Sequence, residues 1–184
     1  MANLLTVLGI LVTLLIALFP YLRKTFFQGP ELTIEFKKGQ TSSNSLGVIY
    51  NSLFDGLYDM RKEKLQYQYT WNFEIIIRNN SEYTAYYPKI FFKDNNSPFL
   101  TIENLNEQQP IGSKEKITLK AVYQEIEETT SDKRSKMIDL PIAITETQIL
   151  LEYKNDKKTI FYTLYNQTYK SNDFFRRKPK IFRV

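Results

Sequence analysis

The chain has 184 residues, of which 42% are hydrophobic and 15% aromatic, and its formal net charge is +5. This composition fits a packed domain and excludes a wholly disordered chain. Because the sequence contains neither cysteine nor histidine, it also excludes disulfides, the usual zinc sites and nucleophilic machinery of the Ser-His-Asp or Cys-His kind. Only carboxylate, lysine, tyrosine or hydroxyl chemistry remains, and we expect no cofactor. The modest positive charge fits ordinary solubility or attraction to an anionic partner such as lipid.

An uncharged and almost wholly aliphatic segment covers residues 1–22. As a helix it is long enough to cross a bilayer core of ~30 Å, and its apolar side chains point in all directions, as lipid contact requires. Residues 17–20 (ALFP) make a poor signal-peptide cleavage site, and a buried core helix would carry a polar face. The segment therefore predicts a retained single-pass transmembrane anchor. Its lipid-facing residues are Leu4, Leu8, Leu11, Leu15 and Phe19.

Positive charge follows this segment and does not precede it. The linker, residues 23–30, begins with Arg23 and Lys24, whereas the N-terminal side carries only the α-amino group. Positively charged flanks of membrane helices stay in the cytoplasm. We therefore expect a membrane protein whose remaining chain is cytoplasmic, with Arg23 and Lys24 at the membrane surface.

Residues 31–170 have the alternating hydrophobicity of a β-rich domain. Predicted strands cover residues 31–37, 66–78, 85–93, 99–102, 116–123, 138–144, 148–153 and 159–165. Trp71 lies in the middle of an unbroken apolar face, so we expect it in the core. Pro88 predicts an edge position or a bulge for its strand. Short strands with regular turn signals indicate a mainly β fold, an antiparallel immunoglobulin-like sandwich, with a small β-barrel as the alternative.

Three stretches carry a resemblance to known modules. They are residues 74–81 (EIIIRNNS), 85–92 (AYYPKIFF) and 110–119 (PIGSKEKITL). Along these stretches, a strand ends in an Asn-containing turn, a second strand follows, and a Pro/Gly turn then leads into a third strand. In this pattern the chain resembles the bacterial CARDB and fibronectin-type immunoglobulin-like modules over residues 67–165. The resemblance is at the level of the fold, and it implies a binding or spacer module without catalytic residues.

Two segments depart from a minimal sandwich. Residues 39–64 form an insertion, and its part from 50 to 62 has apolar residues at helical spacing, which predicts a short amphipathic helix. This helix is either a lid over the end of the sandwich or a partner-binding or lipid-facing element. Its possible contact residues are Leu53, Phe54, Leu57 and Tyr58. Residues 125–136, with Glu125 and Glu127, indicate a solvated loop of mixed charge, and a paired-carboxylate site is the alternative.

Residues 171–184 form a basic C-terminal tail in which five cations lie among three phenylalanines and an isoleucine. The cations are Arg176, Arg177, Lys178, Lys180 and Arg183. Such a segment suits an anionic bilayer surface, where each cation contributes ~1 kcal/mol. Nucleic-acid binding is the weaker interpretation, and a flexible solubilising end is the plain alternative.

Three hypotheses of function follow. The first is a non-enzymatic, membrane-tethered interaction or sensing module that recruits a protein partner, or a second copy of itself, at the lipid bilayer. The second is a membrane-acting effector, for instance in bacterial antiphage immunity, in which the β-domain binds a signal such as a nucleotide and clustered anchors perturb the bilayer. Its motive is only the analogy of a small anchor joined to a β-domain. The third is an enzyme that uses carboxylates, and no catalytic motif supports it.

Overall fold

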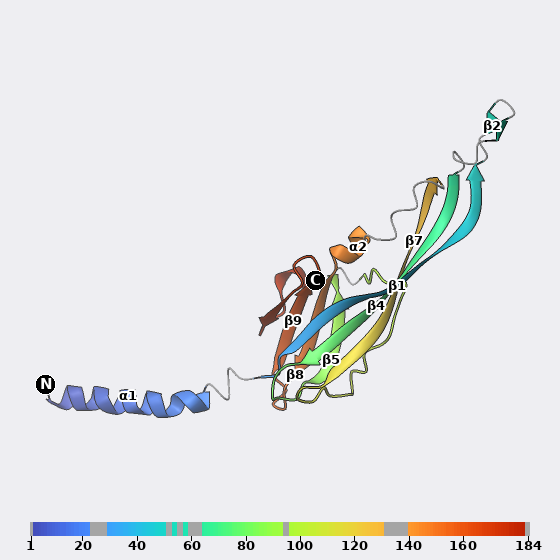
Figure 1. Ribbon diagram of the computed structural model, residues 1–184. Helices are drawn as coiled ribbons and strands as arrows, with labels where there is room; N and C mark the ends of the chain where they lie inside the picture. Colours follow the sequence, from blue (N-terminus) through green and yellow to red (C-terminus); the bar gives the residue numbers. More distant parts are fainter. Residues whose placement is uncertain are drawn as a thin grey trace.

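The computed structural model describes residues 2–22, 29–50, 53–54, 57–58, 64–93, 96–130 and 140–182. Within these ranges the fold is mainly β, with two four-stranded antiparallel sheets that form a sandwich (Figure 1). The first sheet has the order β1 (Leu32–Tyr50), β4 (Lys64–Asn79), β7 (Lys116–Thr130) and β6 (Thr101–Ile102). The second has the order β10 (Ser171–Phe175), β9 (Ile160–Asn166), β8 (Gln148–Lys154) and β5 (Tyr86–Phe92). The predicted mainly β class is confirmed.

Strand β4 supplies much of the core because its side chains alternate between the two faces of the first sheet. Its buried residues on the inner face are Tyr67, Tyr69, Trp71, Phe73, Ile75 and Ile77. They pack with residues of the second sheet such as Ile149, Leu151 and Tyr153 in one hydrophobic cluster. Trp71 is 4% exposed, which confirms the prediction that it lies in the core.

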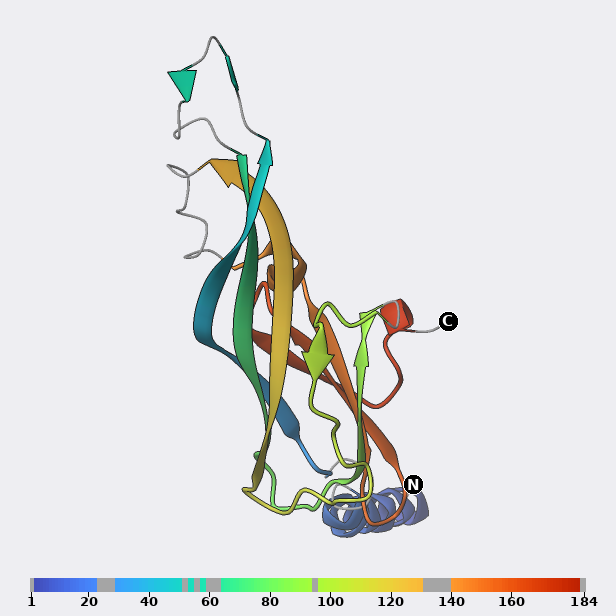
Figure 2. The same cartoon turned by 90° about the vertical axis from the view of Figure 1, so that its right-hand side faces the viewer.

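Strands β1, β4 and β7 are much longer than the strands of the second sheet, and they continue past it as a three-stranded extension (Figures 1 and 2). We call this extension the arm; it comprises residues 41–50, 64–70 and 123–130. Register shifts in β1, between Lys38 and Thr41 and again between Ser45 and Gly47, accompany its bend. Gly47 has φ +121°, a conformation that side chains with a Cβ rarely adopt.

Two predicted elements differ from the structure. The helix expected over residues 50–62 is wrong at its described positions, because Leu53–Phe54 and Leu57–Tyr58 form a small antiparallel pair, β2 and β3. The sequence places Asp-Gly between them, and this dipeptide is the strongest hairpin signal. The strand expected over residues 138–144 is also wrong where it is described, since Pro141 leads into a short helix, α2 (Ile142–Thr145).

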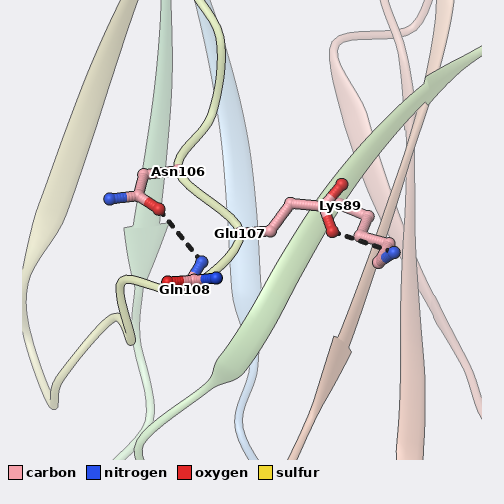
Figure 3. Close-up of polar contacts among 4 residues, drawn as sticks. All are labelled: Lys89, Asn106, Glu107 and Gln108. Atoms are coloured by element: carbon pink, nitrogen blue, oxygen red, sulfur yellow. Dashed lines mark hydrogen bonds and ion pairs between the residues drawn. The ribbon is translucent and has the colours of Figure 1, made fainter.

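The edge strand β5 confirms the interpretation of Pro88. The pairing of β5 with β8 shifts between Tyr86 and Lys89, and Tyr87 has φ 52°. Lys89 then reaches across to the loop that follows β6, where its Nζ lies 2.9 Å from Glu107 Oε2 (Figure 3). The hydrogen bond and charge of Glu107 raise the pKa of Lys89. Because both side chains are about half exposed, this ion pair contributes little to stability.

The second half of β7 and the C-terminal residues depart from the expected loop and free tail. Strand β7 continues to Thr130, so the segment expected to be a loop from residue 125 begins as a strand. The expected tail begins as β10 on the edge of the second sheet and ends in a 3-10 helix, η4 (Lys180–Phe182). Phe182 is buried against Leu150 and Tyr162 on the outer face of that sheet. The described part of the C-terminal segment is therefore folded onto the domain.

The N-terminal segment is a helix, α1 (Ala2–Leu22), as the sequence predicts. Its exposed apolar side chains include Leu8, Leu11 and Phe19, each more than half exposed. Leu4 and Leu15 also belong to α1, but their side chains lie outside the described part. Among the described residues, none of the helices has the length and apolar character that crossing a membrane needs.

Candidate functional site

A cavity of about 320 Å³ opens at the base of the arm, between the first sheet and the segment that leads into α2. We call it the arm pocket. Its lining residues come from three elements: Tyr69 and Trp71 of β4, Glu125 and Glu127 of β7, and Leu140, Pro141 and Ile142. The lining of this pocket combines two aromatic rings with two carboxylates.

The register of β4 and β7 builds one wall of this pocket. Tyr69 lies opposite Glu125, and Trp71 lies opposite Tyr123. Since successive side chains alternate between faces, Tyr69 and Trp71 share a face with Tyr123, Glu125 and Glu127. Cross-strand neighbours on one face lie close enough to interact directly. The two carboxylates therefore stand beside the aromatic rings and not on the opposite surface of the arm.

The aromatic residues form a continuous layer. The ring centroids of Tyr69 and Trp71 lie 5.8 Å apart, and those of Trp71 and Tyr123 lie 5.6 Å apart. Both pairs are tilted, an arrangement in which the positive edge of one ring approaches the negative face of the next. The face of each ring in this layer carries negative partial charge, and a cation is attracted to such a face.

Trp71 carries a polar atom that the surrounding protein does not satisfy. Its indole Nε1 is buried and has no hydrogen-bond partner in the part of the chain that the structure describes. A buried donor without a partner costs ~1–3 kcal/mol, and most buried polar groups in proteins are paired. Trp71 lines the arm pocket, and its indole N–H is a buried donor without a described partner.

The electrostatic character of the pocket is acidic. Burial, and after it the negative charge and hydrogen bond of Glu125, raises the pKa of Tyr123. The Tyr123 hydroxyl thus stays protonated and interacts with the Glu125 carboxylate. Glu125 and Glu127 are the charged residues that line the pocket, and no basic residue lines it among the described residues. A positively charged group that enters the pocket would meet two carboxylates and the aromatic layer together.

Catalysis and metal binding receive no support from this arrangement. The described residues contain no group of three or more Asp, Glu, His or Cys side chains that could hold a metal ion. Glu125 and Glu127 alternate with Ile126 along one strand, and Glu125 accepts a hydrogen bond from the Tyr123 hydroxyl.

The predicted site residues are distributed over several places. Leu53 pairs with Tyr58, and Phe54 pairs with Leu57, so these four lie together in β2 and β3, but their side chains are outside the described part. Arg23, Lys24 and Arg183 also lie outside the described residues. Arg176, Arg177, Lys178 and Lys180 follow β10 at the end of the second sheet. The predicted site residues whose side chains the structure describes do not line the arm pocket.

The mixed charge of residues 125–136 predicts a loop, and a loop gives no reason to connect Glu125 and Glu127 with Trp71. The signal for a strand was present, because the alternation of Ile117, Leu119, Ala121 and Tyr123 continues into Glu125 and Glu127. The strand pattern is hard to recognise there because the side chains on this face change from apolar to acidic after Tyr123. The register with β4, which brings residues about 55 apart side by side, could not be read from the local pattern.

Comparison with known proteins adds no assignment to this picture. No protein-family model matches the chain, and no curated protein matches its sequence.

Proposed function

We propose that this chain is a non-enzymatic, membrane-tethered interaction module whose arm pocket binds a basic side chain of a partner protein. The observation that carries the proposal is the grouping of Trp71, with its unpartnered indole N–H, beside Glu125 and Glu127. An arginine or lysine side chain would stack on the aromatic layer and face the two carboxylates.

The outer edge of β7 supports a peptide-like partner. Strand β6 pairs with β7 at Ala121 and Val122, and among the described residues no further strand pairs with β7 on that side. An extended peptide can add to such an edge as a further strand, with alternate side chains entering pockets on one face. Glu125 and Glu127 lie on the part of β7 beyond Val122.

The strand order supports an immunoglobulin-like module. With β2 and β3 set aside, the first sheet contains the first, second, fifth and fourth strands in chain order. The second sheet contains the third, sixth, seventh and eighth. Immunoglobulin constant-type sandwiches have the orders 1-2-5-4 and 3-6-7, so β10 would be an added edge strand. Modules of this architecture present binding surfaces on a rigid frame.

The proposed tether is α1 together with the linker. The full segment of residues 1–22 carries no charged side chain, and the described apolar side chains of α1 are exposed on all sides of the helix. Exposing a large aliphatic side chain to water costs ~1.5–3 kcal/mol relative to burying it. A lipid environment would remove this cost. Flotation of the full chain with phosphatidylcholine vesicles tests the tether, and a chain that stays in the aqueous fraction would contradict it.

The arm pocket has a built-in reporter, because Trp71 is the only tryptophan of the chain. Titration of the full chain in detergent with a short arginine-containing peptide should change the emission of Trp71. A peptide with citrulline in place of arginine keeps the shape and removes the charge, so it should give a much smaller response. Raised salt should weaken the arginine response, because part of the attraction is between charges.

The matched variants lie on one strand. Glu125→Gln with Glu127→Gln removes both carboxylates and should reduce the affinity for the arginine peptide at least tenfold. Glu128→Gln is the control, because Glu128 lies on the opposite face of β7, across from Gln66. Equal responses of the two variants, or equal responses to the arginine and citrulline peptides, would contradict the proposed binding mode.

A second candidate function is the membrane-acting effector, and one feature of α1 favours it. Gly9, Thr13 and Ala17 lie four residues apart and line a shallow groove along the helix. Small residues at this spacing let membrane helices approach closely and associate. Gly9→Leu would fill the groove, since no atom lies within 4 Å of a Cβ built at Gly9. Growth arrest on overexpression that Gly9→Leu abolishes would favour the effector.

A further inference from the structure

The end of the second sheet presents aromatic and basic side chains together. Strand β10 ends with Phe174 and Phe175, which are 47% and 38% exposed, and Arg176 and Arg177 follow at once. Phe175 lies opposite Tyr162 of β9, so it stands next to the turn between β8 and β9. That turn contributes Lys157 and Lys158 on the surface. Two segments distant in sequence therefore bring cations and exposed rings to the same end of the second sheet.

This surface adjoins the point at which the chain enters the domain from the linker. A shallow cavity of about 170 Å³ is lined by Gly29, Pro30 and Glu31 on one side and by Phe174, Phe175 and Arg176 on the other. Gly29 packs so closely on the Phe161 ring that an added Cβ would lie 2.3 Å from it. The exposed phenylalanines are consequently held beside the linker to α1.

The basic side chains are positioned by the aromatic residues beneath them. The Arg176 guanidinium lies 4.9 Å from the centroid of the Phe161 ring, and Lys178 Nζ lies 5.2 Å from that of Phe91. Lys157 and Lys158 lie in a turn that the Asn155 side chain stabilises, because Asn155 Oδ1 accepts from Thr159 N–H at 2.8 Å. These cations thus form part of a folded surface.

We propose that this surface, comprising Phe174, Phe175, Arg176, Arg177, Lys157 and Lys158, docks on the anionic lipid of the membrane that holds α1. The inference rests on the proposed tether, which would bring the surface to the bilayer at high effective concentration. Exposed phenylalanines enter the headgroup boundary, and the cations around them attract anionic headgroups. Charge complementarity and the adjacent linker identify lipid as the occupant.

The folded state changes which residues take part. Phe182, which the sequence places among the apolar residues of the tail, packs against Leu150 and Tyr162 and is not available to lipid. Phe174 and Phe175 remain exposed. Because β10 is already ordered on β9, docking does not have to order a flexible tail, and that lowers the entropic cost of binding.

The test uses the absence of cysteine from the chain, which allows one polarity-sensitive label at a chosen site. The full chain carrying Thr159→Cys is labelled and reconstituted into vesicles of phosphatidylcholine alone or with phosphatidylglycerol. With phosphatidylglycerol we expect a blue shift of the label and at least threefold less quenching by iodide, both reversed by high salt. A label at Ser43→Cys, on the arm, should respond equally in the two vesicles.

The variant Arg176→Glu with Arg177→Glu should abolish the response of the label at Thr159→Cys. Lys64→Glu with Lys170→Glu makes the same change in net charge elsewhere, on the arm and in the turn between β9 and β10, and should leave the response intact. A chain that does not float with phosphatidylcholine vesicles would refute the tether. A chain that floats but responds equally in both vesicles would refute the lipid-docking surface alone. The same shift on adding an RNA oligonucleotide to phosphatidylcholine vesicles would assign the surface to nucleic acid and overturn the inference.

Discussion

The side-chain amide of Asn172 pairs with both main-chain groups of Ile34. The Ile34 N–H donates to Asn172 Oδ1 at 2.8 Å, and Asn172 Nδ2 donates to the Ile34 carbonyl oxygen at 3.0 Å. Strands β1 and β10 are edge strands of different sheets. The amide of Asn172 therefore takes the place of a neighbouring strand and joins the two sheets along one side of the sandwich. An edge whose main-chain groups are paired is also protected from pairing with other chains.

The same edge is closed two residues earlier by a ring of hydrogen bonds. The Leu32 N–H donates to the Tyr153 hydroxyl at 3.3 Å, and Thr163 Oγ1 donates to the Leu32 carbonyl at 2.7 Å. The Tyr153 and Thr163 hydroxyls lie 3.0 Å apart, so Tyr153 donates to Thr163 when the other two bonds are made. All three residues are buried. The start of β1 is thus fixed to the second sheet by polar side chains at alternate residues.

Replacing Asn172 should measure this connection. Asn172→Ala leaves both Ile34 groups without their partner, and we expect a loss of ~1–3 kcal/mol in the free energy of unfolding. Asn172→Asp keeps an acceptor for the N–H but, when ionised, places negative charge against the carbonyl oxygen, so it should destabilise near neutral pH and recover in acid. Urea unfolding of the full chain, followed by Trp71 emission, measures both. Asn80→Ala is the control, because the Asn80 side chain donates to the Thr33 hydroxyl and to no main-chain group of an edge strand; an equal loss there would contradict the role of Asn172.

The free energy of unfolding should fall in alkaline solution. Burial raises the pKa of Tyr153, while its hydrogen bonds to Thr163 and Leu32 act in the opposite direction. A pKa that is higher in the folded state than the unfolded value of ~10 means full stability below pH ~10 and loss of stability as the pH rises through the folded value. Urea unfolding at pH values about one unit apart, from about 8 to about 12, measures how the free energy of unfolding changes with pH.

Tyr153→Phe isolates the contribution of this hydroxyl to the alkaline loss. The variant should be less stable at neutral pH, because the Leu32 N–H and Thr163 lose a partner, but its stability should decline less steeply above pH ~10. Tyr169→Phe is the control, since Tyr169 is exposed. A slope for Tyr153→Phe equal to that of the unmodified chain would show that Tyr153 does not titrate with unfolding.

Trp71 should contribute strongly to stability. It is almost fully buried between Tyr69 and Tyr123, so Trp71→Ala should cost ~3–5 kcal/mol through lost burial and the cavity left behind. Trp71→Phe should cost less, because it keeps an aromatic ring and removes the unpartnered indole N–H. Thermal unfolding followed by circular dichroism compares the two variants. A native Trp71 emission like that of indole in water would contradict its buried position.

The parts of the fold that depend on local pattern could be predicted from the sequence. The alternation of β4 predicted a half-buried strand and the core position of Trp71, because a period of two residues fixes which side chains face the core. Pro88 predicted the irregular edge strand, because proline cannot donate to a neighbouring strand. These inferences need only the residues of one element.

The remaining features depend on contacts between distant residues. Ile34 and Asn172 are 138 positions apart, and nothing in the sequence of either strand indicates that one side chain completes the edge of the other. The arm pocket depends on the register of β4 with β7 in the same way. The strand expected over residues 138–144 failed because the β-branched residues that favour a strand follow Pro141, which favours the start of a helix.

The proposed cytoplasmic position of the domain gives a final prediction. Arg23 and Lys24 follow the apolar segment, and residues 1–22 carry no charged side chain, so the bias in positive charge favours a cytoplasmic C-terminal side. In intact cells a Gln108→Cys variant, in an exposed loop of the domain, should resist a membrane-impermeant maleimide and react after permeabilisation. Asn3→Cys should show the opposite order, because the N-terminus would lie outside.

Arg23→Glu with Lys24→Glu removes the bias in positive charge and should increase labelling of Gln108→Cys in intact cells. Ready labelling of Gln108→Cys in the unmodified background, with protection of Asn3→Cys, would reverse the proposed topology while leaving the tether itself in place.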